Sequence, residues 1–309
     1  MKREYRTPKT NRIRYHDEEF VRGIAYVVMT ILAISAIAPL VLLLSASFSS
    51  EESLSNHGYQ FIPIDFSLDA YKYIWAARDT IGQAYLMTII VTVIGTTLSV
   101  IITSMLAYAL IQKGIPGQKL ISLLLIVTLL FNGGIVASYI IWTNVFHIKN
   151  TIFALILPNL LMNGFSVILV MSYYRTSISP EIIEAARIDG ASEARTYFSV
   201  MLPLSKPILA TVGLMAALAF WGDWTNGLYY LTAEHSELYT IQLLLNRMNQ
   251  SIEFLAQNPN IAAQFGNVGM PTASVRMAIA LVGVLPVLVA YPFFQKYFVA
   301  GLTQGGVKG

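Results

Sequence analysis

The sequence has no cysteine and few charged residues. The absence of cysteine excludes a disulfide framework, thiolate metal sites and thiol catalysis. Asp, Glu, Lys and Arg make up 12% of the 309 residues, whereas soluble domains carry about 25%. A chain this poor in charge cannot cover a globular surface with polar groups, which argues against a disordered protein, a coiled coil and a cytosolic enzyme. The formal net charge of +3 is small and indicates no nucleic-acid partner.

Sequence motifs of catalysis and nucleotide binding are also missing. The four histidines are far apart in the chain, at His16, His57, His147 and His235. There is no HExxH zinc motif and no GxSxG nucleophile motif, so we predict neither a catalytic residue nor a metal site. The chain also lacks a GxxxxGK[ST] phosphate loop, and therefore it cannot bind ATP in that manner.

Six long stretches contain almost no charged residue. A helix needs about 20 mostly apolar residues to cross a membrane, and continuous apolar runs favour helices over the alternating pattern of a barrel. The runs are Gly23–Ser50, Thr80–Gln112, Leu120–Phe146, Asn150–Tyr174, Pro207–Ala233 (broken only by Asp223) and Met277–Gln295. The sequence therefore predicts an all-α, polytopic membrane protein with six transmembrane helices. A cleaved signal peptide is the alternative for the first run, but that run is long for one.

Lysine and arginine are distributed unevenly between the loops. Fifteen of the twenty lie in the N-terminal tail, the 113–119 turn, the 175–206 loop and the C-terminal end. Cytoplasmic loops carry the excess of Lys and Arg, so we predict that both termini and the 175–206 loop are cytoplasmic. The expected organisation is a cytoplasmic tail over 1–22, a membrane domain over 23–299 and a cytoplasmic tail over 300–309.

Helix-breaking residues lie inside several of the predicted spans, at Pro39, Pro158, Pro286, Pro292 and Gly133–Gly134. Lipid cannot satisfy a freed backbone carbonyl, so these sites are expected to face other helices or a wet cavity. Ordinary packing in a helix bundle accounts for such residues as well.

The 175–206 loop has a helical pattern of its own. Ser179 and the proline after it are typical of a helix start, and Asp189–Gly190 is typical of a helix end. A second short helix is predicted from Ser192 through Met201, ended by Pro203 and Pro207, which lead into the membrane. The apolar side chains of this helix–turn–helix suit either docking to another protein or packing on the membrane or on the chain's own helices.

The loop sequence EAARIDGASEARTYFSVMLPLSKP resembles the cytoplasmic loop of ABC-importer permeases of the maltose-type superfamily, in the form found in carbohydrate importers. Residues 131–159, 221–231 and 296–309 are similar to the permeases of the polysaccharide and oligosaccharide branch. The resemblance implies the type I ABC importer permease fold. The loop residues that fall on the family pattern, and that it implies for coupling to the ATPase, are Glu184, Ala185, Ala186, Asp189, Gly190, Ala191, Leu202 and Pro203.

The same resemblance implies a set of partners in a bacterial cytoplasmic membrane. These are a second, homologous permease subunit in a heterodimer, two cytoplasmic ABC ATPases that use ATP and Mg, and an extracytoplasmic solute-binding protein that delivers a sugar or oligosaccharide. The chain itself would bind no cofactor and would not be an enzyme. The alternatives are an ABC-importer permease for a non-sugar solute, such as an amino acid, and an intramembrane enzyme.

Polar and aromatic residues at membrane depth indicate a path for the sugar, because carboxylates and amides match its hydroxyls and aromatic rings match its faces. The candidates are Asn132, Asn159, Asn163, Trp221, Asp223, Trp224, Asn226 and Tyr230. Helical spacing would place Asp223, Asn226 and Tyr230 on one face. Bonds between helices and aromatic anchoring at the membrane surface are the alternatives. A carboxylate at this depth needs a partner, for which Arg276 is a candidate.

Two segments predicted to lie outside the cell are residues 51–79, which are rich in aromatic side chains, and residues 234–272. They either fold onto the outer mouth of the protein or dock the binding protein.

Overall fold

The regular structure of the chain is helical throughout the described residues. The computed structural model describes residues 15–112, 114–258 and 273–306, and it has no β-strand in these ranges. The first half contains α1 (Tyr15–Ser47), α2 (Glu51–His57), α3 (Asp69–Ala76), α4 (Arg78–Ile111), α5 (Gln118–Leu130), α6 (Gly134–Ile140), a π-helix (Ile141–Val145) and α7 (Phe153–Ile156). The all-α prediction is confirmed.

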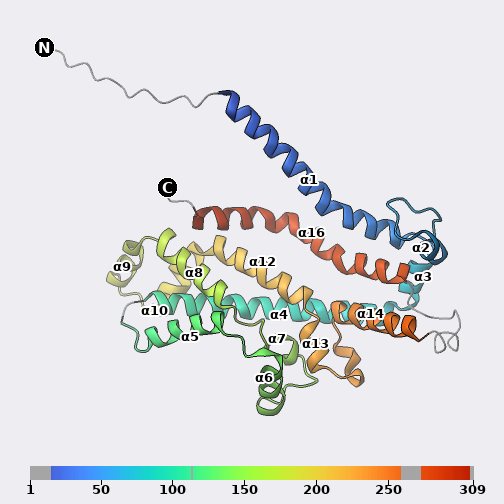
Figure 1. Ribbon diagram of the computed structural model, residues 1–309. Helices are drawn as coiled ribbons and strands as arrows, with labels where there is room; N and C mark the ends of the chain where they lie inside the picture. The colour runs from blue at the N-terminus through green and yellow to red at the C-terminus, as the bar shows by residue number, and fades with distance from the viewer. Residues whose placement is uncertain (1–14, 113, 259–272, 307–309) are drawn as a thin grey trace.

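The second half begins with α8 (Gly164–Ser177), which leads into the segment predicted to form two short helices. That segment contains α9 (Pro180–Ile188), α10 (Glu193–Thr196), a π-helix (Tyr197–Met201) and α11 (Leu202–Leu204). It is followed by α12 (Lys206–Gly222), α13 (Thr225–Tyr230), a 3-10 helix (Ala233–Leu238), α14 (Ile241–Gln257) and α16 (Ala273–Gly306). Figure 1 shows α9 and α10 at one end of the molecule and α2 and α3 at the other.

Three of the six predicted spans are not continuous helices. The third breaks between α5 and α6, the fourth between α7 and α8, and the fifth between α12 and α13. By length and apolarity, two described helices are long enough to cross a membrane alone, namely Glu19–Ser47 within α1 and all of α4. The segment 193–222 becomes a third if its two parts, bent by 79°, are taken as one span. The sequence pattern therefore located the apolar segments correctly but overstated their regularity.

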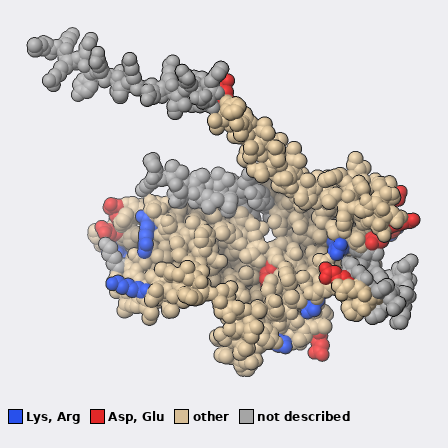
Figure 2. Space-filling model, viewed as in Figure 1, with Lys and Arg blue, Asp and Glu red and all other residues tan. Residues whose placement is uncertain are grey.

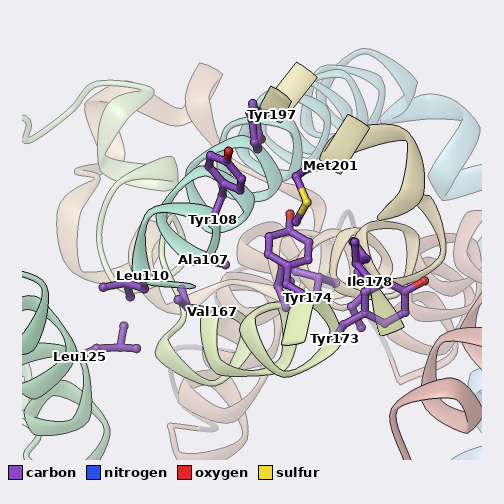
Figure 3. Close-up of a cluster of buried hydrophobic side chains, with 13 residues drawn as sticks. Ala107, Tyr108, Leu110, Leu125, Val167, Tyr173, Tyr174, Ile178, Tyr197 and Met201 are labelled. Atoms are coloured by element: carbon purple, nitrogen blue, oxygen red, sulfur yellow. The ribbon is translucent and has the colours of Figure 1, made fainter. Parts of the chain in front are cut away.

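α12 lies at the centre of the packing, between α4 and α16. The contact with α4 depends on Gly95, because a Cβ built there would lie 2.5 Å from Cζ of Phe220. A cluster of buried side chains from α4, α8 and the 197–212 segment fills the end near α9 (Figure 3). Two further clusters lie around Val91 and Ile279, and a smaller one contains Ile148, Ala154 and Tyr230.

α1 extends away from the rest of the molecule over much of its length (Figure 1). From Glu19 to Ala36 its side chains are all exposed, and large apolar ones such as Phe20, Met29 and Ile34 are more than half exposed. Only its later turns run beside α16. Such a helix is stable only where lipid or another membrane protein covers it.

The end of the molecule formed by α2 and α3 is closed by contacts between distant segments. The Glu51 carboxylate accepts hydrogen bonds from the N–H groups of Ala273 and Ser274, and thereby caps the start of α16. Phe48 stacks on Phe66 and Tyr71. Part of the aromatic-rich segment thus folds onto the body of the protein, which is one of the two alternatives, whereas Phe61 and Trp75 remain exposed. Of residues 234–272, positions 259–272 lie outside the described residues.

Charged side chains are concentrated towards the two ends of the molecule. Figure 2 shows Lys, Arg, Asp and Glu atoms near α9 and α10 and again near α2, α3 and the loops around α13, with few between them. The intervening surface on this face carries few charged side chains, as a membrane requires of the belt embedded in it.

Candidate functional site

The segment from Pro180 to Leu204, here called the hairpin, forms the two short helices predicted from its sequence. α9 begins directly after Ser179 with Pro180 in its first turn, although the Ser179 side chain makes no capping hydrogen bond. Gly190 has φ 79°, a left-handed conformation that glycine adopts without steric cost. Ser192 then caps α10 by accepting a hydrogen bond from the N–H of Arg195 at 3.3 Å. The predicted turn at Gly190 is confirmed.

Pro203 does not end the second helix as predicted. The chain passes from α10 through a π-helical turn into α11, which includes Pro203, and breaks at Ser205. At this break the hairpin and α12 meet at 79°. Proline fits here because it lies in the first turn of α11, where a missing N–H costs least.

Polar contacts fix the hairpin to the last turns of α4. The Tyr108 hydroxyl donates to Oε2 of Glu193 at 2.8 Å, and Arg187 forms an ion pair with Oε1 of the same carboxylate at 3.0 Å. Arg187 also donates to Oε1 of Gln112 at 2.5 Å. Glu193 therefore joins both helices of the hairpin to α4. We call this set of contacts the Glu193 anchor.

An aromatic contact beside the Glu193 anchor is buried. Tyr197, the first residue of the π-helix, lies 2.5 Å from Ser104 through its hydroxyl, and its ring is 5.3 Å from that of Tyr108. Met201 and Tyr174 complete the buried cluster around it (Figure 3). Because this packing and the Glu193 anchor act together, the hairpin cannot shift without moving the end of α4.

The residues predicted for coupling lie mostly on the free side of the hairpin. Glu184, Ala185, Asp189, Gly190 and Pro203 are exposed, and Ala186, Ala191 and Leu202 are half-buried. Their neighbours form an apolar surface, in which Ile188 is 86% exposed, Phe198 59% and Ile182 45%. A patch of this kind on a short helix, next to small alanines, is typical of a protein contact.

The candidate residues for the solute path are concentrated at the three helix breaks. Asn132 follows α5, Asn159 and Asn163 lie between α7 and α8, and Asp223 and Trp224 separate α12 from α13. Irregular backbone at membrane depth is tolerated where it is buried in protein or lines a wet cavity, and interrupted apolar segments are good indicators of a transport site.

Contacts bring these breaks together. The Asn226 side chain donates to the carbonyl of Pro158 at 3.0 Å, which joins α13 to the break between α7 and α8. A Cβ built on Gly164 would lie 3.0 Å from Leu129, so the end of α5 also lies against the start of α8. We refer to this region as the three-break region.

The side chains of the three-break region divide into structural and exposed groups. Asp223 accepts from the N–H groups of Thr225 and Asn226, at 3.1 and 3.3 Å, and so starts α13. Trp221 donates to the carbonyl of Gly283, and buried Tyr230 stacks on Tyr139. The exposed candidates are Asn132, Asn159, Asn163 and Trp224. Asn132 and Asn163 have a structural role as well, because their side-chain oxygens accept from the N–H groups of Gly134 and Ser166.

Two geometric expectations are wrong. Asp223 is extended, with ψ 122°, so Asp223, Asn226 and Tyr230 do not share one helical face. Arg276 donates to the hydroxyl of Tyr59 at 3.3 Å, and no ion pair among the described residues joins it to Asp223. The carboxylate of Asp223 is satisfied by backbone N–H groups instead.

Sequence reasoning missed the residues that fix the hairpin, namely Tyr108, Gln112, Arg187, Glu193 and Tyr197. A weak signal existed, because Tyr108 and Gln112 are polar residues one helical turn apart at the end of an apolar run. Nothing in that pattern identified Glu193, 85 residues later, as the partner of Tyr108.

Comparisons with known proteins agree with this arrangement. The family described as "Binding-protein-dependent transport system inner membrane component" matches residues 74–304. The chain is 31% identical over 284 residues to the polygalacturonan/rhamnogalacturonan transport system permease protein YtcP of Bacillus subtilis (strain 168), which covers 92% of this chain and 96% of that protein. It is 32% identical over 273 residues to protein LplC of the same organism, with 88% and 90% covered.

A solved structure is similar over nearly the whole length. A bacterial ABC transporter involved in the import of the acidic polysaccharide alginate contains a chain that matches with a TM-score of 0.74 and 27% sequence identity. The match covers 94% of this chain and 100% of that one.

Proposed function

The chain belongs to the family of binding-protein-dependent transport system inner membrane components, and we propose that it is the permease subunit through which an ATP-driven importer passes an oligosaccharide. It is embedded in the membrane, and its family consists of transport components rather than enzymes. The importer family implies ATPase and solute-binding partners and a sugar as the transported solute.

The observation that carries this proposal is the hairpin with its Glu193 anchor. Its free side presents Ile182, Ile188 and Phe198 to a partner, while its other side is fixed to α4 through Glu193. A partner bound to the apolar side of the hairpin can therefore move α4, because the hairpin is fixed to α4 on its other side. We assign the partner as one of two cytoplasmic ATPases, which bind ATP and Mg, whereas this chain binds no cofactor. The docking contacts fall on Glu184, Ala185, Ala186, Asp189, Gly190, Ala191, Leu202 and Pro203.

The three-break region is the proposed solute path. Three interrupted segments meet there, and the exposed side chains include two kinds of group that a sugar needs. The amides of Asn132, Asn159 and Asn163 can bond hydroxyls, and the indole of Trp224 can cover a sugar face. Trp221, Asp223, Asn226 and Tyr230 hold the shape of this region through the bonds and stacking described above. Two relatives named for polysaccharides, YtcP and the alginate importer, support an oligosaccharide as the solute.

The remaining assembly follows from the surfaces that the chain leaves open. The exposed apolar length of α1 supports a second, homologous permease subunit beside it, as a heterodimer. A solute-binding protein would dock at the end formed by α2, α3 and the loop before α14. The Lys and Arg distribution supports cytoplasmic termini, a 1–22 tail, a membrane domain over 23–299 and a 300–309 tail, in a bacterial cytoplasmic membrane.

Transport by the assembled importer tests the proposal. Inside-out membrane vesicles that contain the complete complex would be loaded with the binding protein and with labelled oligogalacturonide or a labelled neutral oligosaccharide. We expect export of one probe that depends on ATP outside the vesicle, because inverted vesicles reverse the import direction. A labelled amino acid serves as the competing solute. Transport of the amino acid, with neither saccharide moved, would contradict the proposed substrate class.

A further inference from the structure

A pocket of about 250 Å³ lies between the end of α4, the end of α8 and the start of α9. Its polar wall is formed by Gln112, Arg175, Glu184 and Arg187, and its apolar wall includes Ile178 and Ile183. Ile188 and Phe198 of the apolar docking surface do not line this pocket. Of its lining residues, Glu184 alone is among the proposed docking contacts, and none belongs to the proposed solute path.

The polar wall favours an anion. Two guanidinium groups and one carboxylate, that of Glu184, line the pocket; Arg187 is also paired with Glu193, whereas Arg175 has no carboxylate partner among the described ion pairs. Oε1 of Gln112 accepts from Arg187, which fixes the orientation of the amide and leaves Nε2 as the free donor. Nε2 is buried and has no acceptor among the described residues. A buried donor without an acceptor is costly, so an oxygen-rich group is the expected occupant.

The location of the pocket indicates the source of that group. α4 is one of the two helices long and apolar enough to cross a membrane alone, and it ends at Ile111 beside the pocket. The pocket therefore lies where the membrane surface meets the hairpin. Basic pockets between helices at this level bind the head groups of anionic lipids. Ile178 and Ile183 add apolar surface that lipid carbons can cover but a free phosphate cannot.

We propose that this pocket binds the phosphate group of an anionic lipid. Arg175 supplies a charge with no carboxylate partner among the described ion pairs. Gln112 supplies the buried N–H donor, and Arg187 links the site to Glu193. The bound phosphate would hold Arg187 in place and so stabilise the contact between the hairpin and α4. Coupling of ATP hydrolysis to transport would then depend on the lipid composition of the adjacent leaflet.

Native mass spectrometry of the purified full chain tests this site. The probes are phosphatidylglycerol, zwitterionic phosphatidylcholine and inorganic phosphate, each titrated separately. Gln112→Glu keeps an acceptor for Arg187 but replaces the free donor with a charge that repels phosphate. Arg175→Gln removes an exposed cation without touching the Glu193 anchor. The matched controls, Gln60→Glu and Lys72→Gln, lie at the opposite end of the molecule.

We expect the wild-type chain and both controls to retain one phosphatidylglycerol in preference to phosphatidylcholine. Each test variant should bind it at least about fivefold more weakly, the ratio expected for one cation near a membrane surface. Circular dichroism checks that the variants keep their helix content, and Arg175→Gln decides the question if Gln112→Glu does not fold. Equal lipid retention in both test variants and the wild type would overturn the site. Inorganic phosphate that binds as tightly as the lipid would overturn the lipid assignment.

Discussion

The hydroxyl of Tyr108 donates a 2.8 Å hydrogen bond to the carboxylate of Glu193, across 85 positions of sequence. Tyr108 belongs to the last turns of α4, and Glu193 begins the second helix of the hairpin. The same carboxylate pairs with Arg187 of the first helix. Any movement imposed on the free side of the hairpin therefore reaches a helix that is long and apolar enough to span the membrane.

Tyr108→Phe should weaken this transmission while Arg187 still pairs with Glu193. A hydrogen bond to a charged group contributes about 1.5–3 kcal/mol, so we expect uptake per ATP hydrolysed to fall by about tenfold or more. The measurement is uptake and ATP hydrolysis by the reconstituted complex, recorded together. Tyr26→Phe, on the exposed part of α1, is the control and should behave as wild type. An unchanged ratio in Tyr108→Phe would show that this bond does not serve coupling.

Gly190→Val should disturb the docking side of the hairpin. The glycine has φ 79°, and a β-branched residue in the left-handed region costs at least about 1–2 kcal/mol. We expect the variant to remain in the membrane but to lose most of its ATPase partner during co-purification. Gly82→Val is the matched control, because Gly82 lies in α4 with open space around its Cβ position and no left-handed φ. Normal ATPase recovery with Gly190→Val would argue against docking at this turn.

Trp224→Ala should reduce sugar uptake without affecting assembly. The indole is 40% exposed at the break between α12 and α13, and an aromatic contact contributes about 0.5–1.5 kcal/mol. We therefore expect uptake at limiting sugar to fall by about two- to tenfold, with unchanged basal ATP hydrolysis. Leu123→Ala removes an apolar side chain that is 57% exposed in the middle of α5, and serves as the control. Full uptake by Trp224→Ala would place the sugar site elsewhere.

Gly95→Ala should destabilise the bundle, since the new methyl group would lie 2.5 Å from Cζ of buried Phe220. Overpacking of this kind costs about 1–3 kcal/mol. The thermal unfolding temperature of the purified chain in detergent should fall clearly below that of the wild type. Gly82→Ala, which meets no neighbour within 4 Å and gains helix propensity, should leave it unchanged or raise it. If the two variants had the same thermal unfolding temperature, the close contact between α4 and α12 at Gly95 would not contribute to stability.

The orientation can be tested by thiol labelling, because the native chain has no cysteine. A membrane-impermeant reagent added to intact cells should label Asn56→Cys and Ser236→Cys, which lie at exposed positions away from the hairpin. Asp189→Cys, exposed on the hairpin, should react only after the cells are opened. Labelling of Asp189→Cys in intact cells would reverse the predicted orientation.

Local signals in the sequence predicted the hairpin well. The signals were the proline after Ser179, the glycine at 190, and Ser192 before a glutamate. Each determines the backbone conformation only of its close neighbours in the chain, so tertiary packing did not change the helix boundaries that they predicted. The same is true of Pro158 and Gly133–Gly134, which marked two of the helix breaks. Hydropathy averages over such breaks, and for that reason it predicted continuous spans where the chain is interrupted.

Long-range contacts could not be predicted in the same way. The role of Asp223 depends on a local change from helix to extended backbone, which a helical projection does not contain. The pairing of Tyr108 with Glu193 and of Asn226 with the carbonyl of Pro158 depends on how separate helices pack. A single sequence shows which polar groups are present, but it does not show which of them lie within hydrogen-bonding distance of one another.

Site-specific cross-linking from the free side of the hairpin tests the central claim most directly. A photoreactive residue would replace Ile188, which is 86% exposed, or half-buried Ile183, which packs into the cluster beneath the hairpin. In the native membrane complex, the account predicts that Ile188 cross-links to the ATPase subunit and that Ile183 does not. Cross-links from Ile188 to lipid or to this chain alone, in a complex that still hydrolyses ATP and transports, would contradict it.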